Sequence, residues 1–184
     1  MRLVLAFGLA AALAGVAFAG SVPYPVYNAV HGRVVGWQPL GRGFAVAYLT
    51  GRPAGWCGLD GGSWRLALVE NTTTGPPRIT IDRRLEGSMC GNELVWLRTG
   101  RLTDGRHREV ALSILTTPSI GATAWVFRIH RARLALVRRF FADRIAIKPA
   151  VVTLTWLPGH SPDGRTTREV WRFGRGVYRL VVKR

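Results

Sequence analysis

The sequence predicts an all-β protein built from about a dozen short antiparallel strands. Glycine and proline recur about every 8 to 15 residues, and the segments between them are rich in valine, isoleucine, tryptophan and phenylalanine. Several segments also alternate, as Trp64, Leu66 and Leu68 do within 63–70. Strands are expected at Arg33–Trp37, Phe44–Thr50, Ser63–Glu70, Arg78–Asp82, Glu93–Arg98, Glu109–Leu115, Ala122–His130, Arg133–Phe140, Arg144–Lys148, Val151–Trp156, Arg168–Phe173 and Val177–Val182.

Turn signals indicate hairpins between several of these strands. Gly174-Arg175-Gly176 separates the last two, and both of its glycines tolerate a positive φ. Many short strands joined in this way are typical of a sandwich, a barrel or a propeller-like array of sheets. No long linker divides residues 20–184, so we expect a single β-rich domain there.

Residues 129–146 fit two interpretations. The segment contains few helix breakers, and a basic amphipathic helix would indicate a membrane or nucleic-acid surface. Its apolar residues form a broad set rather than a stripe, however, and Arg138-Arg139 interrupts them. Strands are the favoured interpretation, with a hairpin around Arg131-Ala132.

The N-terminus has the three parts of a secretory signal peptide. Arg2 supplies the positive charge, residues 3–19 are apolar, and Ala17-Phe18-Ala19 forms a small-x-small cleavage site. An uncleaved N-terminal anchor is the alternative, but a bilayer span needs about 20 strongly apolar residues. We expect residues 1–19 to be removed, the protein to be secreted or in the cell envelope (periplasmic or extracellular), and the mature chain to lack a transmembrane segment.

The chain is strongly basic, almost entirely through arginine. It has 26 Lys and Arg residues against 10 Asp and Glu, and only Lys148 and Lys183 are lysines. Removing residues 1–19 takes away Arg2 alone, which leaves a net charge of +15. Arginine pairs bidentately with phosphate or carboxylate, which favours an anionic polymer or a membrane surface as partner, and export disfavours nucleic acid. The alternative is that a GC-rich genome scattered these arginines over solvated strand faces.

Cys57 and Cys90 are the only cysteines. In an oxidising compartment, an even pair favours a disulfide. A metal pair or a catalytic thiol is the alternative, but neither cysteine has a histidine or a second cysteine at ligand spacing. One disulfide between Cys57 and Cys90 is therefore expected.

The segment Asp104-Gly105-Arg106-His107-Arg108-Glu109-Val110 resembles the Asp-Gly to Glu-Val loop-into-strand unit of FG-GAP or VCBS-type repeats. The resemblance implies a β-propeller blade of the kind found in exported adhesion proteins, where several loop aspartates hold calcium. This loop has a single aspartate, with Arg101 nearby in place of acids, so calcium is not expected. The alternative is a plain Asp-Gly turn followed by a strand residue, Glu109, that pairs with an arginine.

The sequence contains no recognisable catalytic constellation. His160-Ser161-Pro162-Asp163 brings Ser, His and Asp together, but neighbours in a Pro/Gly turn do not face one another as a nucleophilic triad does. Several acids adjoin an arginine, as in Asp82-Arg83, Asp143-Arg144 and Arg168-Glu169, and salt bridges would explain them. The four histidines lie far apart. No catalytic residue, metal or cofactor is expected.

The leading hypothesis is a non-catalytic exported β-domain that binds an anionic extracellular or envelope partner. Candidate binding residues are Arg106, His107 and Arg108 of the Asp-Gly loop, and Trp56 in a glycine-rich stretch. The other tryptophans are expected mainly in the core. One alternative is a secreted hydrolase that acts on cell-wall or polysaccharide substrates through an unidentified acid pair, and another is a structural subunit of an envelope assembly.

Overall fold

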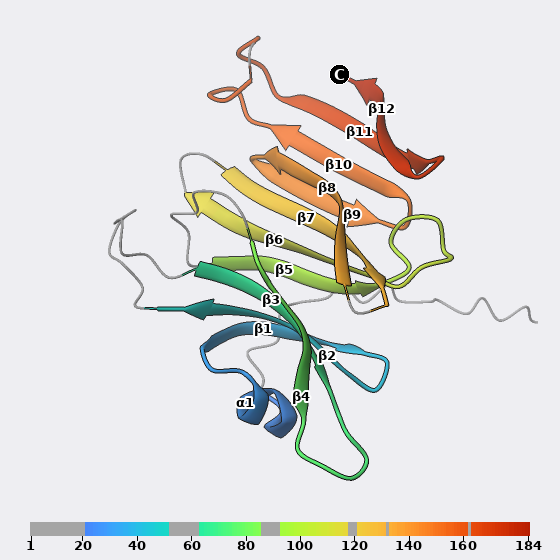
Figure 1. Cartoon of the computed structure of the whole chain (residues 1–184). Helices are drawn as coiled ribbons and strands as arrows, with labels where there is room; N and C mark the ends of the chain where they lie inside the picture. Colours follow the sequence, from blue (N-terminus) through green and yellow to red (C-terminus); the bar gives the residue numbers. More distant parts are fainter. Residues whose placement is uncertain (1–20, 52–62, 86–92, 118–120, 132, 162) are drawn as a thin grey trace, which may run out of the picture.

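The computed structural model describes residues 21–51, 63–85, 93–117, 121–131, 133–161 and 163–184 (Figure 1). Its strands form three four-stranded antiparallel sheets, none of which closes into a barrel. Within each sheet the strands lie in chain order, so sequence neighbours are also hydrogen-bonded neighbours. The expectation of an all-β fold with about a dozen antiparallel strands is confirmed.

The three sheets take their strands from consecutive parts of the chain. Sheet A contains β1 (Arg33–Leu40), β2 (Gly43–Thr50), β3 (Ser63–Glu70) and β4 (Arg78–Arg84). Sheet B contains β5 (Glu93–Gly100), β6 (Glu109–Thr117), β7 (Gly121–His130) and β8 (Arg133–Ala142). Sheet C contains β9 (Arg144–Lys148), β10 (Val151–Trp156), β11 (Thr167–Gly174) and β12 (Val177–Lys183). Each expected strand is present, with bounds that differ by a few residues at most.

The sheets stack face to face in the order A, B, C (Figure 1). One apolar core joins sheets A and B, and a second joins sheets B and C. The short helix α1 (Tyr24–Ala29) packs Val26 on the outer face of sheet A in a third cluster. In the described part of the chain, nothing comparable covers the outer face of sheet C. The helix and this open face therefore lie at opposite ends of the stack.

Sheet B is buried on both faces, and the two faces differ in residue size. Toward sheet A, it presents large side chains such as Leu112 and Trp125. Toward sheet C, it presents the small residues Ala111 and Ala124. Tyr178 of sheet C belongs to the same core. Because successive residues of a strand point to opposite faces, this pattern lets one sheet contribute to two cores.

Three half-buried arginines tie the sheets together. Arg83 of β4 donates to a backbone carbonyl of β8 at 2.5 Å, and Arg98 of β5 donates to one of β9 at 2.6 Å. Arg138 of β8 donates to a carbonyl of β12 at 3.4 Å, and its guanidinium lies 4.2 Å from the ring centre of Trp171. These contacts account for part of the arginine content without any external partner.

Residues 129–146 form strands, as the favoured interpretation predicted, and not a helix. Leu134 and Phe140 of β8 are buried in different cores, which requires the alternation of a strand. The sequence pattern did not reveal α1. This helix is six residues long with no side-chain cap, and its stability comes from burying Val26 rather than from any periodicity that a sequence displays.

The β11–β12 hairpin has a two-residue turn at Arg175-Gly176, since Gly174 pairs with Val177. The positive φ values fall on Arg175 (50°) and Gly176 (84°). Gly174 does not use the freedom that the sequence suggested for it, because it is the last strand residue. Positive φ at both central positions matches the right-handed twist of the flanking strands.

Trp64, Trp96 and Trp125 are buried, in agreement with the core assignment of the tryptophans. Trp56, Cys57 and Cys90 lie outside the described residues, as do residues 1–19. Among the residues that the structure describes, no helix has the length and apolar character needed to cross a bilayer.

Candidate functional site

The Asp-Gly loop between β5 and β6 is organised around the buried carboxylate of Glu109. Glu109, the first residue of β6, has no exposed surface. Its Oε2 accepts hydrogen bonds from the backbone N–H groups of Leu102 (2.7 Å) and Thr103 (2.9 Å), and its Oε1 accepts one from the Thr103 hydroxyl. Arg128 Nη2 lies 3.5 Å from Oε1. Glu109 thus holds the loop from within, as the alternative of a turn followed by an arginine-paired strand residue expected.

Asp104 closes the same loop from outside. Its Oδ1 accepts the backbone N–H of Arg106 at 3.0 Å, and it also faces His107 and Arg128. The hydrogen bond from Arg106, followed by the charges of His107 and Arg128, lowers the pKa of Asp104 to about 2. The carboxylate therefore stays ionised at any pH at which the fold is expected to work.

The structure does not bring the predicted binding residues of this loop into one site. Arg106 is exposed, His107 Nδ1 lies 3.2 Å from Oδ1 of Asp104, and the guanidinium of Arg108 lies beside the β1–β2 turn at Gly41. His107 therefore has a structural partner, while Arg108 belongs to a different part of the surface. Trp56 cannot be placed, because it lies outside the described residues.

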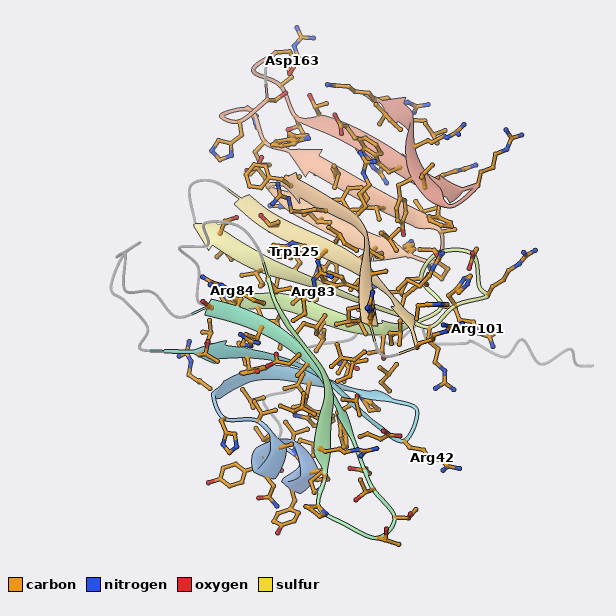
Figure 2. The ribbon with its side chains drawn as sticks, viewed as in Figure 1. Arg42, Arg83, Arg84, Arg101, Trp125 and Asp163 are labelled. Carbon is orange, nitrogen blue, oxygen red and sulfur yellow. The ribbon has the colours of Figure 1, made fainter. Side chains whose placement is uncertain are left out.

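The loop between β10 and β11 repeats the Asp-Gly turn. Oδ1 of Asp163 accepts the backbone N–H of Arg165 at 3.2 Å, just as Asp104 accepts that of Arg106, and Gly164 has a positive φ of 64°. Asp163 lies at the tip of its loop, at the far end of the molecule from α1 (Figure 2). The β5–β6 connection of sheet B and the β10–β11 connection of sheet C therefore use the same kind of turn.

The Ser-His-Asp cluster of this loop is not a triad. Ser161 Oγ donates to Asp163 at 2.5 Å, whereas the imidazole of His160 pairs with Asp143, which comes from a different turn. Burial opposes ionisation of Asp143, but the N–H of Leu157 and His160 outweigh it and lower the pKa of this carboxyl. The histidine therefore has a carboxylate partner and makes no hydrogen bond with Ser161 among the described contacts, in agreement with the turn interpretation.

Ion pairs account for the acids Asp82 and Glu169, but their partners are not the arginines next to them in sequence. Asp82 pairs across the sheet with Arg65 at 2.9 Å, and Glu169 pairs with Lys183 at 3.4 Å. Neighbours in a strand point to opposite faces, so an acid at one position and an arginine at the next cannot meet. The arginine beside Glu169, Arg168, consequently points to the open face of sheet C.

That open face carries six exposed basic side chains and is the strongest candidate for a binding surface. Ile145, Ile147, Val152 and Leu154 are buried against sheet B, so the alternate residues of β9 and β10 point outward. Residues of β11 that pair with the outward-pointing positions of β10 also point outward, and so do the residues of β12 that pair with them. The basic face is defined by Arg144, Lys148, Arg168, Arg172, Arg179 and Arg184.

The strand register arranges the basic face in two rows. One row runs across the sheet through Arg144, Thr155, Arg168 and Arg184, and the other through Lys148, Val151, Arg172 and Arg179. The rows are four residues apart along β11, or roughly 13 Å. A neutral row of Ala146, Thr153, Val170 and Val182 lies between them, where a shallow groove of about 280 Å³ is open to solvent.

Like charges stand directly opposite each other on this face. Arg172 pairs in register with Arg179, and Arg168 exchanges two backbone hydrogen bonds with Arg184, at 2.6 and 2.9 Å. Directly opposed like charges destabilise a sheet. Within the described chain, none of the six side chains forms an ion pair within 4 Å, although the charge of Arg144 helps to lower the pKa of the adjacent Asp143. The sheet therefore carries a repulsion that an external anion would relieve.

The sequence contains a signal for this face in the spacing of its basic residues. Arg168 and Arg172 flank Val170, and Arg144 and Lys148 flank Ala146, at the spacing of residues on one side of a strand. This spacing indicates that the side chains lie on the same face of their sheet. It does not indicate whether that face is exposed, because exposure depends on the order in which the sheets stack.

Among the described residues, no three His, Asp or Glu side chains gather as metal ligands would. The basic face itself consists of cations and neutral residues, so it offers sites to anions rather than to metals. No protein-family model matches the chain, and no curated protein matches it in sequence.

Proposed function

We propose that this protein is a non-catalytic, exported β-domain that binds an anionic polymer through the basic face of sheet C. The observation that carries the proposal is the convergence of six exposed basic side chains on one open sheet face. Arginine forks suit carboxylate, sulfate or phosphate groups, and two rows roughly 13 Å apart suit a ligand with repeated charges. The opposed arginine pairs add a driving force, because a bound polyanion neutralises their repulsion.

The position of the basic face favours a polymer as its partner. If an N-terminal anchor attached the chain to a membrane, the basic face would be far from that membrane. The chain enters the fold through α1, which lies at the opposite end of the stack from the basic face (Figure 1). Stacked sheets are about 10 Å apart, so the basic face lies roughly 20 Å beyond sheet A. Charge attraction is screened over about 8 Å at physiological salt. A membrane beside α1 would therefore be out of reach of the basic face.

The described acids give less support to the hydrolase alternative. Glycoside hydrolysis needs two carboxyl groups that face a common cleft. Asp104 and Glu109 are both close to one arginine, at 3.6 and 3.5 Å from Arg128 Nη2, and Glu109 is fully buried. Arg128 thus gives both carboxyl groups a structural partner.

The structural-subunit alternative would require a broad exposed apolar surface. Val177, Leu180 and Val181 are about half exposed, at 45–52 %, but they lie along one strand, β12, at an edge of sheet C. This strand offers a pairing edge rather than an apolar face. Tyr24 and Tyr27, which are more exposed, lie on the short helix α1 on the outer side of sheet A. The observations therefore favour the basic face as the principal binding surface.

Salt-dependent retention tests the proposal. We expect the purified protein to be retained on heparin, used as a sulfated polysaccharide probe. If six contacts form, its affinity should fall on the order of a thousandfold between 50 and 200 mM salt, through counterion release. Vesicles of phosphatidylglycerol form the second arm. Retention on heparin that exceeds retention on vesicles supports the polymer, stronger binding to vesicles identifies a membrane partner instead, and no salt-dependent retention on either contradicts the proposal.

The proposal also includes export and a Cys57–Cys90 disulfide. Two described residues that are close in sequence to the cysteine-containing segments, Trp64 and Leu85, are adjacent, because the backbone N–H of Leu85 donates to the carbonyl of Trp64 at 2.9 Å. Intact mass measured on protein from the culture or periplasm should show the loss of residues 1–19 and a two-hydrogen deficit that reduction reverses. A full-length cytoplasmic product with two free thiols would contradict both parts.

A further inference from the structure

A second surface, separate from the basic face, is a groove of about 590 Å³ where the core between sheets A and B opens to solvent. Its floor consists of Leu40, Leu68, Ile81 and Ile129, which are continuous with that core. The volume falls in the range of about 300 to 1,000 Å³ that is usual for small-molecule sites. An apolar floor at the end of a core is able to accommodate a hydrocarbon chain.

Three arginines from three different turns surround this floor. Arg42 is in the β1–β2 turn, where Figure 2 labels it, Arg108 is in the Asp-Gly loop, and Arg131 is in the β7–β8 turn with a positive φ of 51°. None of the three forms an ion pair in the described part of the chain. Glu70 is the one acidic residue of the lining, so the rim keeps a net positive charge.

Gly41 makes room for one of these arginines. A Cβ at this position would lie 2.7 Å from Nη1 of Arg108, and the φ of Gly41 is +61°. Only glycine leaves the guanidinium of Arg108 against the β1–β2 turn, beside Arg42. The turn that carries Arg42 therefore also contacts the guanidinium of Arg108, and both arginines line the groove.

We propose that this groove binds an anionic amphiphile, with a carboxylate or phosphate head held by Arg42, Arg108 and Arg131 and a hydrocarbon chain on the apolar floor. The arginine rim supplies the forked donors that both head groups accept. Because the hydrocarbon chain is buried on the floor, the affinity should rise with the length of that chain, which a site for a simple anion would not show. This site does not depend on the basic face, which lies at the other end of the stack.

Calorimetric titration with monomeric octanoate, decanoate, decyl phosphate, decanol and inorganic phosphate tests the site. Each added methylene should raise the affinity about fourfold, so decanoate should bind on the order of tenfold more tightly than octanoate. Tighter binding of decanoate identifies a fatty-acid type of ligand, and tighter binding of decyl phosphate identifies a phosphate head. Decanol should bind at least about tenfold more weakly than either, because it lacks the charge that the arginines recognise.

Two variants and one control locate the binding. Arg108→Gln should weaken decanoate binding at least about tenfold, and Gly41→Ala should weaken it by displacing the same guanidinium. Arg172→Gln on the basic face should leave it unchanged, which separates this site from the polymer-binding surface. The proposal would be overturned if decanol or inorganic phosphate bound as tightly as decanoate. It would also be overturned if a folded Arg108→Gln variant bound decanoate as tightly as the unmodified protein.

Discussion

Replacing Glu109 with alanine should destabilise the fold by about 3–5 kcal/mol, as expected when one partner of a buried charge network is removed. The change leaves the N–H groups of Leu102 and Thr103 without an acceptor, and it takes away the carboxylate facing Arg128. A typical domain has a total stability of about 5–15 kcal/mol, so this loss would leave the protein marginally folded. Urea denaturation followed by tryptophan fluorescence measures the effect.

Glu93→Ala is the matched control. Glu93 is also the first residue of a strand of sheet B, but its side chain is exposed. Surface substitutions of this kind usually change stability by no more than about 0.5 kcal/mol. Glu109→Gln should fall between the two, because the amide keeps one acceptor oxygen but places an NH₂ group against donors. A loss below about 1 kcal/mol for Glu109→Ala would contradict the role assigned to this residue.

The strands could be predicted from the sequence because their causes are local. Alternation and turn residues fix where a strand such as β3 begins and ends, whatever packs on it. The helix α1 depends instead on the burial of Val26 under a sheet formed later in the chain. The residues of the helix show no sequence pattern that would indicate this contact.

The candidate sites depended on non-local information. Arg106, His107 and Arg108 are adjacent in sequence, yet His107 contacts Asp104 and Arg108 contacts the turn of another sheet. The residues of the basic face come from four strands, and their common exposure follows from sheet C being last in the stack. The net charge and composition identify arginine as the main source of positive charge, but they could not show which arginines converge on one face.

Removing three arginines of the basic face should abolish most of the proposed polymer binding without weakening the fold. Arg168, Arg172 and Arg184 line the groove between the two rows, and each is exposed. A basic side chain near an anionic surface contributes roughly 1 kcal/mol, so the triple glutamine variant should lose about a hundredfold in affinity at physiological salt. Its thermal stability should stay the same or rise slightly, because two opposed arginine pairs are neutralised in part.

A second triple variant with the same change in charge separates a defined surface from general attraction. Arg33, Arg84 and Arg133 are exposed on sheets A and B, away from the basic face, and Arg84 is labelled in Figure 2. Their replacement by glutamine lowers the net charge by the same amount. If binding depended only on net charge, both triple variants would lose affinity equally.

The affinity of these two variants for heparin at 0.15 M salt, compared with that of the unmodified protein, is the most direct test of the central claim. The account predicts a loss of about a hundredfold for the triple variant of the basic face and less than about threefold for the variant of sheets A and B. Equal losses in the two variants, or a larger loss in the second, would contradict the assignment of the basic face as the binding surface.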